Sequence, residues 1–473
     1  MNRSIRCLFF RSSALLIIAL AASLLAAIPV NAGSSLSIRH DGIIESYGVN
    51  TLLVDAPSAG SLTVTVRDEY NLFRTFRQEV PAGKSTLQWD GLRDDGQRLG
   101  IYNGTYLLEA ELACPDGASY TASAQAEGRS RQALLYVLPS SDTLYLDGER
   151  WFAEAGAVKE GNIMMTVSPE QAPDTVLLTR RYRLSEKGVG RLQWSGTING
   201  KKVAAGQYLL RYWAEESPDI SLTLEITVTQ GAPPAEAVAP TGPEMPVADA
   251  DDAALWALLQ KPRVVANVPN TKSQKIYERP NRGSAVLGTL FGQSQGVEVL
   301  AVEGDWARIH VWQHEEGISV TGYVPLKMLK VVYPNGPYGL VIDKKTQTLT
   351  LYEKGVRVTS IPVSTGSSVE GKPYLETVPG AFLTDEHIGT FTDGGLNYAF
   401  PIRYDGYGFL HQLGYRVRDR HADFSYQQER LGTKASHGCI RLPDHPVNDS
   451  GVDAFWLWTH LPWHTPILIL DDR

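Results

Sequence analysis

The chain is poor in cysteine and has no excess of positive charge. Only three of its 473 residues are cysteine, namely Cys7, Cys114 and Cys439, too few to hold a secreted chain of this length together by disulfides. The formal net charge of −8 argues against a nucleic-acid partner, because such binding depends on clustered basic side chains. A Gly-rich phosphate loop with its lysine is also missing, so no nucleotide cofactor is predicted.

The ten histidines show no zinc-binding spacing. His387, His445, His460 and His464 lie in the C-terminal part of the chain, but their separations match none of the ligand patterns of zinc sites. Packing or exposure to solvent is the simpler interpretation of these side chains. We therefore predict no metal ion and no other cofactor.

Long apolar runs are lacking except at the N-terminus. Three arginines precede the apolar run 14–30, and Val30-Asn31-Ala32 follows it as a cleavage point. This order is typical of a secretory signal peptide spanning residues 1–32. An uncleaved anchor is the alternative, because the run is almost long enough to cross a bilayer. We expect a protein secreted across the cytoplasmic membrane, in the cell wall or periplasm.

The rest of the sequence has the character of a mainly β multidomain protein. Alternating Val, Leu, Thr and Tyr with Gly and Asn-Gly turns is typical of strands and hairpins, and the density of Pro after residue 230 is typical of an extended linker. The expected parts are two β modules at 33–130 and 131–230, a Pro/Ala-rich linker at 231–261, a small β domain at 262–332 and a C-terminal domain at 338–473.

Two stretches of the β-rich part repeat one pattern. Leu-Gln-Trp-x-Gly occurs at 87–91 and again at 192–196, and Gly-x-Tyr follows at 104–106 and at 206–208. We interpret this repeat as a tandem duplication. The pattern resembles bacterial immunoglobulin-like modules, in which a large aromatic residue fills the core of a β-sandwich. Core packing of these Trp and Tyr residues is therefore favoured over stacking on glycan.

The small β domain carries two further short motifs. Gly304-Asp305-Trp306 and Gly322-Tyr323-Val324 occur in this order, and the run 262–332 resembles a bacterial SH3-type domain with a small barrel. The resemblance implies binding of peptidoglycan peptides. A rigid spacer is the alternative interpretation, and the residues do not decide between the two.

One heptapeptide brings a thiol, an imidazole and a guanidinium together. It reads Ser436-His437-Gly438-Cys439-Ile440-Arg441-Leu442. A nucleophilic cysteine reacts as its thiolate, which a nearby histidine can generate or stabilise. Gly438 lets backbone N–H groups approach a developing oxyanion, and Arg441 suits a substrate carboxylate or, alternatively, a structural salt bridge.

Residues 338–471 resemble the L,D-transpeptidase (YkuD-type) catalytic domain. Ser364-Thr365-Gly366, Pro379-Gly380-Ala381-Phe382, a histidine at a strand end and the heptapeptide follow one another in the family's order. The resemblance implies a β-rich domain with a few short helices. It also implies Cys439 as the nucleophile that forms a thioester from a tetrapeptide stem, releases D-alanine and transfers the acyl group to an amine of a second stem.

The resemblance assigns roles to the neighbouring residues as well. His411 is the implied general base, backbone N–H groups at Gly438 and Cys439 are the implied oxyanion donors, and Ser436 and His437 would orient the imidazole and shape the loop. His421 is the rival base because its spacing from Ser436 is nearer the usual one. His411 is favoured because it ends the apolar run 407–410. Val378 departs from the family, where Thr is frequent.

Three alternatives stay open at the level of the sequence. Water as acceptor would make the protein an L,D-carboxypeptidase, a protein lysine would make it a protein-anchoring transpeptidase, and a vestigial C-terminal domain would leave a non-catalytic wall-binding protein. The expected partners are peptidoglycan stem peptides, and wall glycan or proteins for the N-terminal modules. The family further implies β-lactams of the carbapenem type as inhibitors.

Overall fold

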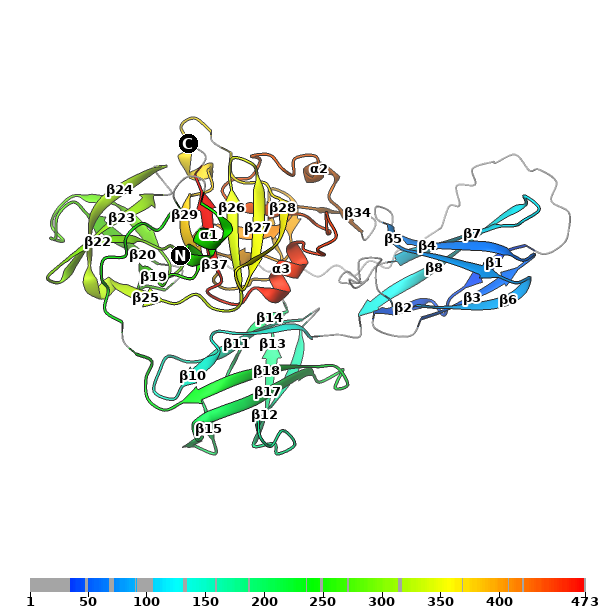
Figure 1. Ribbon diagram of the computed structural model, residues 1–473, viewed down its shortest axis with the longest axis horizontal. Coiled ribbons are helices and arrows are strands. Elements are labelled where there is room, and N and C mark those ends of the chain that lie inside the picture. The colour runs from blue at the N-terminus through cyan, green and yellow to red at the C-terminus, as the bar shows by residue number, and fades with distance from the viewer. Residues whose placement is uncertain are drawn as a thin grey trace, which may run out of the picture.

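The chain forms four β-rich units, which Figure 1 shows in a computed structural model. The structure describes residues 35–471 apart from 47–49, 68–71, 90, 92–104, 131–133, 158–159, 186–187, 235, 247–249, 270–271, 314–316, 368, 407 and 419–420. The expected signal peptide, 1–32, lies outside the described residues. Within the described ranges, no helix has the length and apolar character needed to span a membrane.

The first unit is a two-sheet β module. Its sheets have the strand orders β1-β3-β6 and β2-β8-β7-β4-β5. The strands are β1 (Ser37–Arg39), β2 (Ile43–Ser46), β3 (Asn50–Ala56), β4 (Gly60–Arg67), β5 (Leu72–Val80), β6 (Gly83–Trp89), β7 (Thr105–Ala113) and β8 (Ser119–Ser130). Trp89 and Tyr106 are buried in the core between the sheets.

The second unit has the same topology. Its sheets run β9-β11-β14 and β10-β18-β17-β12-β13, which matches the first unit strand for strand, including a parallel first pair in the larger sheet. The strands are β9 (Leu134–Pro139), β10 (Thr143–Tyr145), β11 (Phe152–Ala157), β12 (Gly161–Pro169), β13 (Leu178–Leu184), β14 (Val189–Gln193), β15 (Thr197–Ile198), β16 (Lys201–Lys202), β17 (Gly206–Ala214) and β18 (Ser221–Thr229). Trp194 and Tyr208 pack edge to face in its core. The repeat in the sequence is thus a repeat in structure, and its aromatic residues are core residues.

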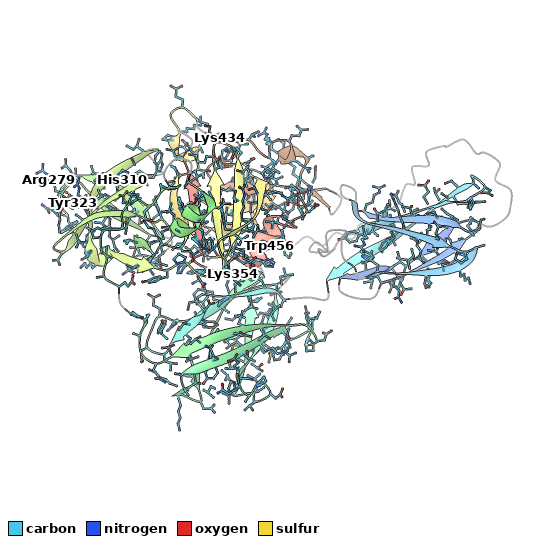
Figure 2. The ribbon with its side chains drawn as sticks, viewed as in Figure 1. Arg279, His310, Tyr323, Lys354, Lys434 and Trp456 are labelled. Carbon is cyan, nitrogen blue, oxygen red and sulfur yellow. The ribbon has the colours of Figure 1, made fainter. Side chains whose placement is uncertain are left out.

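The third unit is a small five-stranded antiparallel sheet with the order β21-β20-β24-β23-β22. It follows helix α1 (Asp252–Leu259), which Asp251 caps by accepting a hydrogen bond from the Ala254 N–H. Arg279, His310 and Tyr323, labelled in Figure 2, lie on this unit. The elements are β19 (Arg263–Ala266), β20 (Ser273–Tyr277), β21 (Val286–Phe291), β22 (Glu298–Glu303), β23 (Trp306–Gln313), β24 (Ile318–Pro325), the 3₁₀ turn η1 (Leu326–Met328) and β25 (Leu329–Val332).

The fourth unit, called here the C-terminal domain, holds the site and contains two sheets. A five-stranded sheet has the order β28-β27-β26-β37-β29 and a three-stranded sheet the order β32-β33-β36. The elements are β26 (Tyr338–Asp343), β27 (Thr348–Glu353), β28 (Val356–Pro362), η2 (Pro373–Leu375), β29 (Gly380–Leu383), β30 (Phe391–Asp393), β31 (Leu396–Tyr398), β32 (Ile402–Arg403), β33 (Phe409–Gln412), β34 (Arg416–Arg418), β35 (His421–Asp423), α2 (Ser425–Gln428), β36 (Ile440–Leu442), α3 (Ala454–His460) and β37 (Pro466–Leu470).

The core of the C-terminal domain fills the space between its two sheets and α3. Leu340, Ile342, Leu410 and Ile440 are among the fully buried members of one apolar cluster. Burial of such side chains is the main favourable term in folding, and it fixes which face of β33 and β36 turns inward. The prediction of a mainly β protein with a few short helices is confirmed.

The second and third units both pack on the C-terminal domain. Residues 294–296 of the third unit extend the five-stranded sheet, with the Leu383 N–H bonded to Ser294 O at 2.9 Å and the Gly296 N–H to Ala381 O at 2.8 Å. Tyr136 of the second unit belongs to the core cluster of the C-terminal domain and packs edge to face on Trp458 of α3. The first unit lies apart from the other three in Figure 1.

Candidate active site

The expected nucleophile and base lie together because of the pairing of β33 with β36. The strands are parallel, with Leu410 opposite Ile440 and His411 opposite Arg441. Leu410 and Ile440 face the core. Since successive side chains point to opposite faces of a strand, His411 and Arg441 share the other face. Cys439 immediately precedes β36 and lies close to β33, because the Phe409 N–H bonds to it and the charge of Arg441 acts on both Cys439 and His411.

The loop that leads into β36 is bonded to residues 364–367, a segment that follows β28. Ser364 and Arg441 exchange two backbone hydrogen bonds of 3.0 and 2.9 Å, and Thr365 O accepts from the N–H groups of Ala435 and Ser436 at 3.0 Å each. The buried amide of Gln347 accepts from the Thr365 N–H at 2.8 Å and donates to Thr365 Oγ1 at 2.7 Å. These bonds fix the position of the loop before Cys439.

Two buried hydroxyls hold the carbonyl of Gly438. Thr377 Oγ1 donates to Gly438 O at 2.9 Å and accepts from the Gly366 N–H at 2.7 Å. The Tyr404 hydroxyl donates to the same carbonyl at 3.2 Å, and burial raises the pKa of Tyr404 well above its ordinary value, so the phenol remains a donor. Gly438 has φ of +110°, a conformation that favours glycine.

The imidazole of His411 is buried among aromatic rings. Its Nδ1 lies 2.6 Å from Gln412 O, so the proton sits on Nδ1 and Nε2 carries the basic lone pair. The rings of Tyr398 and Phe391 contact it edge to face, with centroids 4.7 and 5.8 Å away. Burial first, and then the charge of Arg441, lowers the pKa of His411 to about 4, so the ring is neutral at physiological pH.

The thiol of Cys439 is partly exposed at the surface but poorly solvated. Burial raises its pKa above the ordinary value, while the Phe409 N–H and the charge of Arg441 act in the opposite direction. Burial therefore favours the neutral form of both the Cys439 thiol and the His411 imidazole. A neutral imidazole can accept the proton of a thiol that acts as a nucleophile.

Arg441 is a buried guanidinium beside this pair. Its exposed fraction is 7%, and its Nε has no hydrogen-bond partner. In the part of the chain that the structure describes, no carboxylate lies within ion-pair distance of it. A buried charge without a counter-ion is costly, so the site is suited to an anionic group that arrives from outside.

The family to which this domain belongs follows from a match over its whole length. Residues 337–469 match the family model of the YkuD L,D-transpeptidase catalytic domain. The chain carries an L,D-transpeptidase catalytic domain. No curated protein matches the chain. The match covers the C-terminal domain, so the resemblance seen in the sequence is confirmed there.

Solved structures similar to this chain are also L,D-transpeptidases. One, from Mycobacterium smegmatis, is 16% identical, with 50% of this chain and 96% of that chain covered at a TM-score of 0.22. L,D-transpeptidase 3 from Mycobacterium tuberculosis, in complex with a faropenem-derived adduct, is 13% identical, with 50% and 89% covered at 0.24. The catalytic domain from E. faecium is 18% identical, with 28% and 96% covered at 0.18. Because these TM-scores are low, the family match alone identifies the transpeptidase domain.

The structure gives the expected loop residues distinct places. Ser436 Oγ accepts from the Gly438 N–H at 3.2 Å and donates to Cys439 O, so it shapes the loop and does not touch the imidazole. His437 is exposed. The Gly438 N–H is thus engaged by Ser436. Lys434, at the start of this loop, lies on the side of the transpeptidase domain away from the second unit (Figure 2).

His421 lies on a different strand pair. Its backbone is in β35, which pairs with β34 in a hairpin, whereas His411 is on β33 beside β36. The side chain of His421 is outside the described residues. The choice of His411 over His421 therefore stays a prediction.

The sequence did not point to several residues that build the transpeptidase site. Thr377, Tyr404 and Gln347 hold the catalytic loop, and Phe391 and Tyr398 surround the imidazole. Thr377 immediately precedes Val378, the position where we noted a departure from the family, and Val378 is a core residue. A Thr two residues before Pro-Gly is a sequence pattern by which a hydroxyl that holds a loop can be found. Gln347 and Tyr404 carry no such signal, because their partners are distant in the sequence.

Removal of the Thr377 hydroxyl is expected to destabilise the transpeptidase domain. Thr377→Val keeps the shape but leaves the Gly366 N–H without its partner and takes one of two donors from Gly438 O, which costs about 1–3 kcal/mol. Thr359→Val is the matched control, since that hydroxyl bonds to the exposed amide of Asn448, at 3.1 and 3.4 Å, where water can replace the partner. Urea unfolding of both variants measures the difference. Equal, small changes in the two would contradict the role given to Thr377.

Acidification is expected to weaken the wild-type fold through His411. The folded ring titrates at about 4 and the unfolded ring near 6.5, so between these values the unfolded state binds more protons and stability falls as pH is lowered. The full difference is about 3 kcal/mol. His411→Gln lacks this titration, so its free energy of unfolding should fall less between pH 6.5 and 4. Parallel pH curves for the two proteins would show that burial does not hold His411 neutral.

Proposed function

We propose that this protein is a secreted peptidoglycan L,D-transpeptidase in which Cys439 forms an acyl-enzyme from a tetrapeptide stem. The observation that carries the proposal is the parallel pairing of β33, which holds His411, with β36, which Cys439 immediately precedes, inside a YkuD-type domain. Covalent catalysis of this kind needs a nucleophile with an oriented base next to it. The arrangement supplies both.

The geometry supports a definite order of events. Cys439 Sγ attacks the carbonyl between the diamino acid and the terminal D-alanine, and its proton passes to Nε2 of His411. The oxyanion is stabilised by the Cys439 N–H. The amine of D-alanine then leaves with the proton from His411, and a thioester remains. A side-chain amine of a second stem attacks the thioester carbonyl and loses its proton to His411. The C–S bond then breaks, Cys439 leaves as the thiol with the proton from His411, and the cross-link remains.

Arg441 is proposed to bind a carboxylate of the donor stem. It lies on the same face as His411 and has no acidic neighbour within ion-pair distance among the described residues. The charge-assisted bonds of a guanidinium to a carboxylate are stronger than bonds between neutral groups. A carboxylate from the substrate would also end the isolation of this buried charge.

Location and partners are part of the same proposal. The basic and apolar order of residues 1–32 supports export, and the substrate is found outside the cytoplasmic membrane, in the cell wall or periplasm. The first and third units are proposed to contact wall glycan, stem peptides or wall proteins. One of the similar solved L,D-transpeptidases is in complex with imipenem, a carbapenem, which supports β-lactams of the carbapenem type as inhibitors of this chain.

Acylation of Cys439 is the first expected result. Incubation of the full chain with a carbapenem should add one inhibitor mass to the wild type and none to Cys439→Ala, because the proposal gives the Cys439 thiol a general base, His411. Cys114→Ala is the matched control and should react like the wild type, since Cys114 is buried in the first unit. An adduct on Cys439→Ala, or none on folded wild type, would reject the proposed nucleophile.

The products then identify the acceptor. With a tetrapeptide stem as donor, mass spectrometry should find D-alanine and a dimer joined through two diamino acids. A tripeptide without dimer would instead identify an L,D-carboxypeptidase, and a stem attached to a protein lysine would identify an anchoring enzyme. No turnover with an intact acylation step would point to the rival wall-binding role.

Loss of Arg441 is expected to remove recognition of a carboxylate. Wild type should use a tetrapeptide better than its C-terminal amide, and Arg441→Met should raise KM for the acid about tenfold or more and lose the preference. Arg430→Met, an exposed arginine close by, is the control and should keep it. Wild-type rates that are equal for the acid and the amide would contradict binding of the terminal carboxylate by Arg441.

A further inference from the structure

The second unit buries a sheet face that the first unit leaves open. β3 and β11 occupy the same place in the two modules. Buried and exposed residues alternate strictly along β3, with Thr51, Leu53 and Asp55 exposed, as expected for a sheet with one face in solvent. In β11, by contrast, four consecutive residues, 153–156, are buried. The outer face of β11 is covered by the transpeptidase domain, as Figure 1 shows for β11 and β14 below α3.

Aromatic contacts form much of this covered face. Phe152 packs edge to face on Trp463, with centroids 5.0 Å apart, and the Arg191 guanidinium lies 4.5 Å from the centre of the Trp463 ring. Gly156 makes room for the Tyr136 ring, since a Cβ there would lie 2.0 Å from it. Aromatic contacts of this density are typical of a built interface.

A single carboxylate lies in the middle of the covered face. Glu154 is 2% exposed. It accepts from the His387 N–H at 3.0 Å and from Trp463 Nε1 at 3.1 Å, and Nδ1 of His387 contacts the same carboxylate. Both donors and the His387 imidazole belong to the transpeptidase domain. A buried carboxylate without partners is very costly, so Glu154 specifies this docked arrangement and no other.

His387 belongs to the segment that surrounds the proposed base. Residues 385–403, called here the hairpin segment, begin and end side by side: the Ile388 N–H donates to Pro401 O and the Arg403 N–H to Glu386 O, both at 3.0 Å. His387 itself bridges Ile402, and Ile402 pairs with Leu410, next to His411. The far part of the segment provides Phe391 and Tyr398, the two rings on His411.

We propose that Glu154 is a positioning residue for acyl transfer, and that the second unit is a working part of the catalytic unit. The proposal rests on the proposed function of Cys439 and His411. The Glu154 carboxylate fixes the base of the hairpin segment, and the segment in turn fixes β32 beside β33 and the rings around His411. The corresponding sheet face of the first unit is open, so the first unit has no such role in positioning the catalytic residues.

The test uses the full chain with three substitutions. Glu154→Ala should slow acylation of Cys439 by imipenem about tenfold or more, because small displacements of catalytic groups cost large factors in rate. It should also speed hydrogen exchange of backbone amides in the hairpin segment. Glu154→Gln keeps an acceptor for the His387 and Trp463 donors and should restore the rate to within about threefold of wild type. Glu225→Ala, an exposed glutamate of the same unit, should change neither.

The outcomes separate this proposal from the proposed function. Unchanged acylation and exchange in Glu154→Ala would overturn it, as would slower acylation without faster exchange in the hairpin segment. Equal losses in Glu154→Ala and Glu154→Gln would reduce Glu154 to a structural role. If wild type takes no imipenem, the proposed function fails, and the exchange of the hairpin segment together with iodoacetamide alkylation of Cys439 still decides the positioning role.

Discussion

The parallel pairing of β33 with β36 is the interaction on which the site depends. Two strands of this kind need a long connection, here residues 413–439, and that connection ends in the loop that carries Cys439. The strands themselves give only three paired residues. The position of the loop is therefore fixed by hydrogen bonds from outside this strand pair. They come from residues 364–367, from Gln347 and from the hydroxyls of Thr377 and Tyr404. These buried polar contacts fix the position of Cys439.

Burial sets the electrostatics of the site. It disfavours every charged form, so it raises the pKa of Cys439 and lowers that of His411. Arg441 stays charged and favours the thiolate over the imidazolium. In the proposed function, burial would keep the Cys439 thiol protonated until it attacks a substrate carbonyl, with His411 taking the proton.

The modules show how one fold can serve two purposes. Both have the same topology, and in both the repeated sequence pattern places Trp and Tyr in the core between the sheets. They differ on the outer face of the smaller sheet, where alternation in β3 gives way to continuous burial in β11. Surface residues, which do not affect the module's own fold, decide whether it lies apart or docks on the transpeptidase domain.

The sequence by itself determined the local features of this protein. Alternation and turns indicated the strands, the repeat indicated the duplicated module, and the spacing around Cys439 indicated the catalytic family, because such patterns depend on residues close together in the chain. It also indicated His411 through the apolar run before it. Only the tertiary structure decided the partners that are far apart, such as Thr377 with Gly438, Phe391 and Tyr398 with His411, and Glu154 with His387. Burial and long-range hydrogen bonds depend on which surfaces meet, and neither periodicity nor a motif records that.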